Sequence, residues 1–295
     1  MDQIVIYQAG GMHKHMFDEK LQHWQEYVRS RVPENKLIRY HVPYRNRNVE
    51  GVEHLPFGAY SALDKWYASK AHIVFAYLEQ TNPGGHGAIF EVALQEGTRP
   101  HGLRIVVNED SHNPEDLKSG DVRRYRQAIE WGAHPANYYP TLEEGVHFLE
   151  TILHPFRIPE QHVPAFILLI GDTDFSIRVH EKLSPDSYCI VHYLDDFRFG
   201  YNNHLERATA LRFYAQCADI VAVDFNSLAH PKEKWLRDLA FEIIGTLPLP
   251  QKLVTACAGV AVGHEITCRI PYVFTETDHM IGYIKTALRQ FGYPS

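Results

Sequence analysis

The sequence predicts an α/β protein built from two tandem, doubly wound domains with parallel sheets. Short apolar segments that suit buried strands alternate along the chain with segments of helical periodicity, which is typical of parallel β-α-β units. Similar segments recur in the same order in the two halves, and the 295 residues match two domains of roughly 150. A parallel sheet with helices on both faces is the Rossmann-like or flavodoxin-like arrangement.

Each predicted strand is a short run of mainly apolar side chains, because a parallel strand is buried on both of its faces. In chain order the strands are Ile4–Gln8, Leu37–His41, Ile73–Leu78, Arg104–Val107, Ala165–Ile170, Tyr188–Tyr193 and Ile220–Val223. Helices are predicted where apolar residues recur at helical spacing between these strands. They include Phe17–Arg31, Ala59–Lys70, Ala88–Glu96 and Leu142–Leu153.

Paired segments in the two halves indicate a tandem duplication. The pairs are Ile4–Gly10 with Phe166–Asp172, Tyr67–Val74 with Tyr214–Val221, Ile89–Val92 with Ala240–Ile243, and Tyr139–Thr141 with Val273–Thr275. The proline-rich segment His154–Pro164 lies between the halves and is the best domain boundary. It divides the chain into a first domain at residues 1–157 and a second, related domain at residues 163–295.

The composition excludes several classes of function. A net charge of −7 without a basic stripe argues against a protein that binds nucleic acid duplexes. The longest apolar segments, Pro164–Gly171 and Leu253–Gly263, are shorter than the roughly 20 residues of a membrane span. The N-terminus lacks the basic and apolar regions of a signal peptide, and the four cysteines include no CxxC motif, which together predict a cytoplasmic protein.

No metal and no cofactor are expected. The closest pair among the 19 histidines is His13 and His15, and residues two apart do not share a helix face. The chain has neither an HExxH motif nor a Cys/His cluster. The glycine-rich loop Asn82–Gly87 has neither the Gly-Lys-Ser/Thr of a P-loop nor the GxGxxG spacing of a dinucleotide site.

Glu91 and Asp64 are the candidate catalytic carboxylates. Glu91 lies in or just beyond the first turn of a helix that follows the glycine-rich loop, where glycines admit a ligand and the helix N-terminus favours an anion. Such a carboxylate suits covalent or electrostatic catalysis at a sugar carbon, although it could simply cap the helix. Asp64 lies on the predicted helix before Ile73–Leu78, and its alternative is a solvated carboxylate paired with a lysine.

Several segments of the first half resemble one enzyme family in their order along the chain. They are Ile6–Gly10, Val42–Pro43 with Glu50–His54, Gly87–Glu91, Val107–Asp110 and Trp131–Gly132. Together, over about residues 3–153, they are similar to the nucleoside 2-deoxyribosyltransferase family. The resemblance places the family's glutamate nucleophile at Glu91. It places the family's active-site aspartate at Asp64, eight residues before His72, which opens the next strand.

The resemblance implies a mechanism and a set of substrate contacts. Glu91 would attack C1′ of a (deoxy)ribosyl group to form a glycosyl-enzyme, and Asp64 would protonate or orient the departing base. The sugar site would be lined by Tyr7, Gln8, Gly10 and the Gly84–Gly87 loop, which includes Gly85 and Gly87. His86 of this loop could contact a base or a phosphate, and a loop histidine without that role is the alternative. Base selectivity does not carry over, because the loop has Gly84, Gly85 and His86 where the family often has an acidic residue.

Further positions bear on the substrate and on assembly. Arg45 and Arg47 lie where family members often carry neutral or acidic groups, and arginine binds phosphate, so the substrate could be a nucleotide. Ordinary surface arginines are the alternative. Gln127 lies where the family can supply an asparagine to a neighbouring subunit's site. The resemblance therefore implies a homo-oligomer, or a pseudo-dimer of the two halves within one chain.

The second half is predicted to be a degenerate copy. Leu211 falls at the position of Asp64, and the glycine-rich loop is replaced by His230–Arg237. Glu242 aligns with Glu91, and we expect it to be buried or to cap a helix. Two alternatives to a deoxyribosyltransferase stay open: an N-glycosidase that hydrolyses a nucleoside 5′-monophosphate or NAD, and a sensor that binds a nucleotide without turnover. In every case the expected partner is a small-molecule nucleoside or nucleotide.

Overall fold

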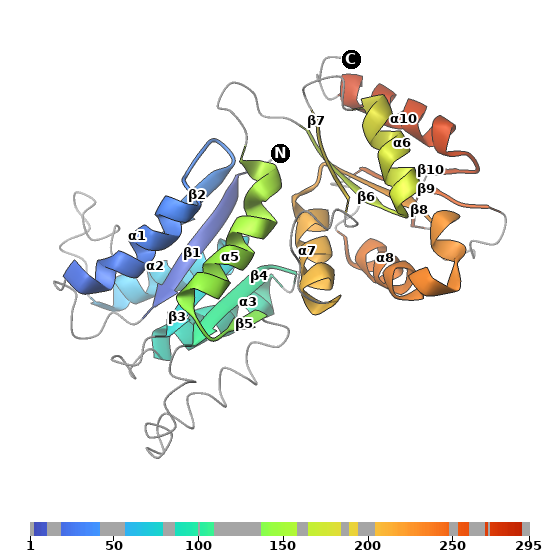
Figure 1. Cartoon of the computed structure of the whole chain (residues 1–295). Helices are drawn as coiled ribbons and strands as arrows, with labels where there is room; N and C mark the ends of the chain where they lie inside the picture. Colours follow the sequence, from blue (N-terminus) through green and yellow to red (C-terminus); the bar gives the residue numbers. More distant parts are fainter. Residues whose placement is uncertain are drawn as a thin grey trace. The chain divides into compact units, whose positions relative to one another are not determined.

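The computed structural model describes residues 3–10, 19–41, 57–78, 86–99, 101–108, 137–157, 165–183, 189–193, 204–247, 253–259, 269–270 and 272–290. Its Cα positions divide the chain into two compact units, Gln3–His154 and Pro155–Ser295 (Figure 1). Each unit contains a five-stranded sheet in which all the strand pairs are parallel. The predicted α/β class with parallel sheets is therefore confirmed.

The first unit has strand order β2-β1-β3-β4-β5, an order of doubly wound sheets. Its strands are β1 (Ile4–Gly10), β2 (Ile38–His41), β3 (Ile73–Leu78), β4 (Leu103–Asn108) and β5 (Asn137–Tyr139). Its helices are α1 (Glu19–Arg31), α2 (Phe57–Lys70), α3 (His86–Thr98) and α5 (Leu142–Leu153). The chain order reverses between β1 and β3, and ligands of such folds bind at the carboxyl ends of the strands beside this point.

Helices cover both faces of the first sheet. On one face, Tyr7 and Ala76 of the sheet pack with Ala68 of α2 and Ala88 of α3 in one buried cluster. These small alanines let α2 and α3 approach the sheet closely, which brings their polar side chains near β1. On the other face, Trp24 of α1 stacks on Phe75 of β3, and α5 packs on β4.

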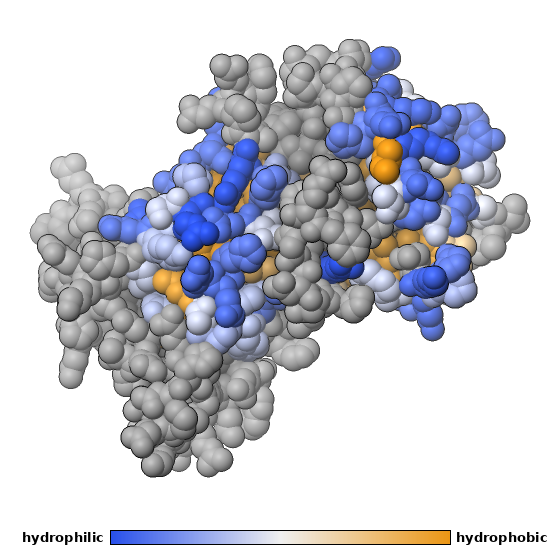
Figure 2. Space-filling view, in the orientation of Figure 1, coloured by the Kyte–Doolittle hydropathy of each residue, from blue (hydrophilic) through white to orange (hydrophobic). Residues whose placement is uncertain are grey.

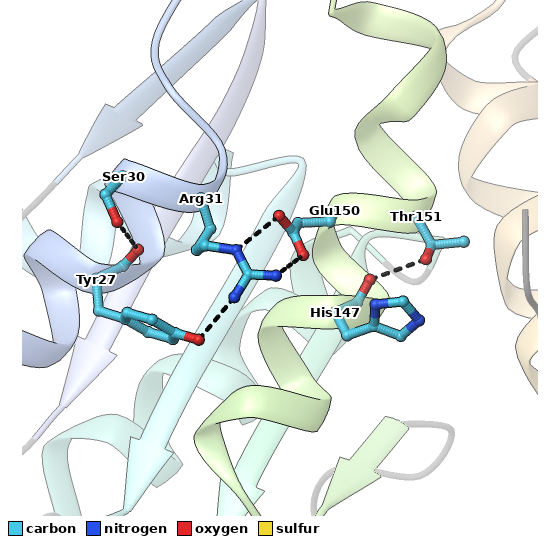
Figure 3. Close-up of polar contacts among 6 residues, drawn as sticks. All are labelled: Tyr27, Ser30, Arg31, His147, Glu150 and Thr151. Atoms are coloured by element: carbon cyan, nitrogen blue, oxygen red, sulfur yellow. Dashed lines mark hydrogen bonds and ion pairs between the residues drawn. The ribbon is translucent and has the colours of Figure 1, made fainter.

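An ion pair joins α1 to α5 on that second face (Figure 3). Arg31 donates from Nε and Nη2 to the two carboxylate oxygens of Glu150, at 2.9 and 2.6 Å. The Nη1 atom of Arg31 donates to the hydroxyl of Tyr27 at 2.8 Å. Because both guanidinium edges are occupied, the Arg31 side chain is fixed between the two helices. The helix α5 also begins at a capping residue, Thr141, whose hydroxyl accepts the backbone N–H of Glu144.

The second unit repeats this architecture, with strand order β10-β9-β8-β6-β7. Its strands are β6 (Ala165–Ile170), β7 (Cys189–Tyr193), β8 (Ile220–Asp224), β9 (Leu253–Cys257) and β10 (Tyr272–Phe274). Its helices are α6 (Thr173–Leu183), α7 (His204–Cys217), α8 (Lys234–Thr246) and α10 (Thr277–Gln290). One core cluster joins α6 and α10 to one face of the sheet, while α7 packs on β6 and α8.

Strand register corrects one of the predicted repeat pairs. Ile6 pairs with Ile73 in the first sheet, and Ile167 pairs with Ile220 in the second. Since Ile73 corresponds to Ile220, the segment Ile4–Gly10 corresponds to Ala165–Gly171, one residue earlier than the sequence comparison predicted. A buried strand of uniformly apolar residues carries little information about register, which is why the sequence alone misplaced it.

A matching hydrogen bond supports the corrected register. The backbone N–H of Val5 donates to Nδ1 of His72 at 3.1 Å. In the second unit the backbone N–H of Phe166 donates to Oδ2 of Asp219 at 2.9 Å. His72 and Asp219 occupy the same place before β3 and β8, so two different side chains perform the same structural role in the two units.

The surface of the described residues is mostly hydrophilic on the face shown in Figure 2, with small, separate hydrophobic patches. The exposed large apolar side chains are spread over both units: Trp66, Phe90, Tyr138, Ile177, Phe241 and Tyr272. Among the described helices, none is long and apolar enough to span a bilayer.

Candidate functional site

A hydrogen bond between Tyr7 and Glu91 marks the candidate site of the first unit. The Tyr7 hydroxyl donates to Oε1 of Glu91 at 2.8 Å. Tyr7 is fully buried on β1, and Glu91 lies on α3 between the buried residues Ala88 and Val92. Successive residues of a strand point to opposite faces, and the Tyr7 side chain is on the face covered by α2 and α3. The bond therefore links the interior strand β1 to the helix α3 that covers this face of the sheet.

Asp64 adds a second carboxylate from the neighbouring helix. Its side chain lies on α2 and is only 7% exposed. Its negative charge raises the pKa of both Tyr7 and Glu91, so the three groups lie within electrostatic reach of one another. The structure thus brings together the two predicted catalytic carboxylates and the predicted sugar-site tyrosine, contributed by α2, α3 and β1.

The electrostatics of the site favour a protonated Glu91 at neutral pH. Burial is the main cause that raises the pKa of Glu91 to about 8, and the charge of Asp64 acts in the same direction. The Tyr7 hydrogen bond and the charge of Lys65 lower the pKa and oppose this effect. The pKa of Tyr7 is raised well above its ordinary value, first by burial and then by Glu91, so the Tyr7 hydroxyl keeps its proton and is the donor of the hydrogen bond to Glu91.

The helix N-terminus is not what holds Glu91. The helix α3 begins at His86, which places Glu91 beyond its first turn. Because the electrostatic effect of a helix terminus falls off within the first turn, its influence on Glu91 is small. The interpretation of Glu91 as a first-turn cap is therefore wrong. The specific partner of its carboxylate is the hydroxyl of Tyr7.

Two predicted sugar-site residues of β1 point away from this pair. Gln8 is fully buried, and its Nε2 donates to the carbonyl oxygen of Gln25 on α1 at 3.3 Å. A Cβ added to Gly10 would lie 2.7 Å from Cζ2 of Trp24, also on α1. Both positions therefore face α1, whereas Tyr7 faces α2 and α3. Strand alternation separates neighbours in sequence onto opposite faces, so the structure does not bring the Gln8 side chain to Glu91.

The structure adds two aromatic residues that the sequence reading missed. His41 is the last residue of β2 and pairs in register with Tyr7. Its imidazole stacks on the Tyr67 ring with centroids 3.4 Å apart, and it lies nearly parallel to the Tyr7 ring at 5.7 Å. The sequence signal was present: the predicted strands Ile4–Gln8 and Leu37–His41 bring these two ring residues side by side if they pair in parallel.

The remaining predicted contacts lie partly or wholly outside the described residues. Arg45, Arg47, Gly85 and Gln127 are all outside them. His86 and Gly87 open α3, but only their backbone is described. Within the described part of the chain, no three His, Cys, Asp or Glu side chains are grouped to hold a metal ion.

The second unit has a different set of side chains at the corresponding place. By register Leu168 occupies the position of Tyr7. The sequence match of Tyr67–Val74 with Tyr214–Val221 places Leu211 at the position of Asp64. Glu242 is 46% exposed and forms a two-point ion pair with Arg212, at 2.8 and 2.9 Å. It is thus neither buried nor a helix cap, contrary to the sequence expectation.

The burial pattern of the two helices explains the difference. Among the described side chains of α3, Ala88, Val92 and Gln95 are buried, and the buried residues of α8 are Leu236, Leu239, Ala240, Ile243 and Ile244. Glu242 lies next to Ile243 but is not one of these buried residues, so its carboxylate is exposed and paired with Arg212.

Comparisons of the chain with protein-family models, with curated proteins and with solved structures found no match.

Proposed function

We propose that the first unit breaks the bond between a base and C1′ of a ribosyl or 2-deoxyribosyl group, through a covalent glycosyl-enzyme on Glu91. The observation that carries the proposal is the Tyr7–Glu91 hydrogen bond beside the buried Asp64. Two carboxylates of different environment are the groups that retaining glycosyl transfer needs, one as nucleophile and one as acid. The residues lie beside the β1/β3 reversal, where doubly wound sheets bind ligands.

The first half of the reaction forms the glycosyl-enzyme. An Oε atom of ionised Glu91 bonds to C1′ while the C1′–N bond breaks, and the departing base takes the electron pair of that bond. Asp64, which enters this step protonated while Glu91 is ionised, supplies its proton to a nitrogen of the base. In the second half, a nitrogen of an acceptor base or the oxygen of water attacks C1′, and Glu91 leaves with the electron pair of its ester bond. Asp64 accepts the proton that the acceptor loses.

Tyr7 orients the nucleophile in this scheme. Its hydroxyl donates to one carboxylate oxygen of Glu91 and leaves the other oxygen available for C1′. The same hydrogen bond stabilises the ionised form of Glu91, which is the reactive form. Because burial raises the pKa of Glu91 to about 8, we expect the rate to rise with pH up to about that value.

The test is a panel of substrates with the full chain. The panel contains 2′-deoxynucleosides, their 5′-monophosphates and NAD, each with and without a free acceptor base, and products are separated by chromatography. Glu91→Gln removes the nucleophile. Glu242→Gln is the matched control, since it changes the same residue type on α8, where the carboxylate is exposed and paired with Arg212.

Three results are informative. A new nucleoside that forms only with acceptor, is lost in Glu91→Gln and persists in Glu242→Gln supports a deoxyribosyltransferase. Free base released without acceptor supports an N-glycosidase, and reaction of the monophosphates or NAD alone would identify the nucleotide alternatives. Tight binding of a panel member without any turnover would overturn the enzyme proposal in favour of a nucleotide sensor.

The cysteine pattern supports the cytoplasm as the compartment that we propose for this activity.

A further inference from the structure

We propose that His41 is a positioning residue of the first unit: stacked on Tyr67 and nearly parallel to the Tyr7 ring, it fixes the Tyr7 ring and so aims the carboxylate of Glu91. This inference rests on the proposed function, because it assigns His41 a role in presenting the nucleophile. It is nevertheless tested through the protonation of Glu91 itself, which can be measured without a substrate.

The rings form a continuous row across three elements. His41 on β2 lies face to face with Tyr67 on α2, with an angle of 21° between the ring planes. The Tyr7 ring on β1 makes an angle of only 11° with the imidazole, and the two ring centroids are 5.7 Å apart. The Tyr7 hydroxyl then reaches Glu91 on α3. The row Tyr67–His41–Tyr7 therefore connects α2 to the nucleophile through stacked rings and one hydrogen bond.

The row controls where the Tyr7 hydroxyl points. A tyrosine hydroxyl sits at the far end of a rigid ring, so a small rotation about the side-chain bonds displaces it from a hydrogen-bond partner. His41 lies beside Tyr7 in the register of the sheet and limits that rotation on one side. Tyr67, contributed by α2, in turn covers His41. A flat ring at position 41 is the feature this arrangement requires.

The charge state of His41 fits a role through packing. Burial, and then the charge of Arg39, lower the pKa of His41 to about 4, so the imidazole is neutral at physiological pH. A cation at this place would favour the ionised form of Glu91 by attraction. A neutral ring instead acts on Glu91 through the position of Tyr7, which is what the stacking geometry indicates.

The second unit offers a matched control position. Leu168 replaces Tyr7 there and pairs in register with His192 of β7, as Tyr7 pairs with His41. Tyr214 corresponds to Tyr67, yet no tyrosine hydroxyl is available at position 168 to hold a carboxylate. His192 therefore occupies the strand position of His41 in the sheet of the other unit, and a change there is the matched control.

The experiment compares His41→Phe, which keeps a flat ring, with His41→Leu, which keeps side-chain bulk without one. The readout is the pH midpoint of the infrared C=O band of protonated Glu91, identified by its loss in Glu91→Gln. We expect His41→Leu to move the midpoint by about half a pH unit or more. We expect His41→Phe and His192→Leu to keep the wild-type midpoint. In a Tyr7→Phe background, His41→Leu should have no further effect, because the hydrogen bond it acts through is gone.

Two results would overturn the proposal. One is an equal shift in His41→Phe and His41→Leu, which would assign the effect to the imidazole nitrogens. The other is a His41→Leu shift that persists in the Tyr7→Phe background. Circular dichroism verifies that each variant is folded. If His41→Leu does not fold, the Glu91 midpoint of His41→Phe is still compared with that of the wild type. The C=O band is measured without turnover. A substrate panel that shows no reaction and a His41→Leu variant that shows no shift of the midpoint are therefore separate outcomes.

Discussion

Tyr7 and Glu91, 84 residues apart in the chain, are joined by a 2.8 Å hydrogen bond in which the tyrosine is the donor. The bond connects β1, an interior strand of the first sheet, to the helix α3. Burial raises the pKa of the Glu91 carboxyl, whereas this hydrogen bond and the charge of Lys65 lower it. The pKa of Glu91 therefore reflects opposing effects that can be altered separately.

Removing the hydroxyl should make Glu91 a weaker acid. Tyr7→Phe deletes the hydrogen bond that favours the ionised carboxylate, and hydrogen bonds to charged groups contribute about 1.5–3 kcal/mol, or roughly one pH unit or more. We expect the infrared midpoint of Glu91 to rise above its value of about 8. Tyr40→Phe is the control, because it removes a buried hydroxyl that donates to the carbonyl of Val32. An unchanged midpoint in Tyr7→Phe would contradict the role of this bond.

Neutralising Asp64 should shift Glu91 in the opposite direction. The charge of Asp64 raises the pKa of Glu91 by repulsion, so Asp64→Asn is expected to lower the infrared midpoint below about 8 while the side-chain shape is kept. If Asp64 also protonates the leaving base, turnover of any substrate found should fall about tenfold or more. A midpoint that rises in Asp64→Asn would show that Asp64 does not act on Glu91 through its charge.

The raised pKa of Glu91 also predicts how stability depends on pH. A carboxyl whose pKa is about 8 in the folded chain, against 4.5 as its ordinary value, keeps its proton on folding and loses it on unfolding between those values. Its stabilising contribution is thus complete below about pH 4.5 and declines as pH rises towards 8. The slope is at most about 1.4 kcal/mol per pH unit. Urea denaturation of wild type and Glu91→Gln from pH 5 to 8 measures it, because groups common to both cancel in the difference. Parallel curves would contradict the raised pKa.

The ion pair between α1 and α5 should contribute modestly to stability. Arg31 binds Glu150 at two points, a geometry stronger than a single contact, but the Arg31 side chain is 39% exposed. Pairs of this exposure contribute about 0.2–1 kcal/mol. A double-mutant cycle with Arg31→Met and Glu150→Gln should give a coupling in that range, and it should shrink in 1 M salt. Arg212→Met with Glu242→Gln provides the corresponding pair on the second unit.

The buried strands were the part of the fold that the sequence predicted best. The strands β3 and β6 were predicted to the residue, because both are buried along their whole length and read as unbroken apolar runs. The edge strands β5 and β10 and the buried strand β9 were not among the predicted strands. Each of the two edge strands is only three residues long and contains exposed positions, so neither forms an apolar run.

The candidate site was predicted in its residues but not in its geometry. Tyr7, Asp64 and Glu91 were all named from the sequence, and the structure brings them to one face of the sheet. Gln8 was grouped with Tyr7 because the two are neighbours in sequence, yet strand alternation places them on opposite faces. His41 was missed for the converse reason, since its contact with Tyr7 depends on strand pairing rather than on sequence proximity.

Two helical glycines with different surroundings should respond oppositely to alanine. Gly97 on α3 has no heavy atom within 4 Å of an added Cβ, so Gly97→Ala should stabilise the chain by about 0.5–1 kcal/mol through the entropy of the unfolded backbone. Gly145 on α5 lies against Cγ2 of Val107 on β4, and a Cβ there would overlap it. Because α5 would have to move away from the sheet, Gly145→Ala should destabilise by about 1–3 kcal/mol. Thermal denaturation of both variants checks the pair, and a stabilising Gly145→Ala would show that α5 does not pack on β4 as closely as described.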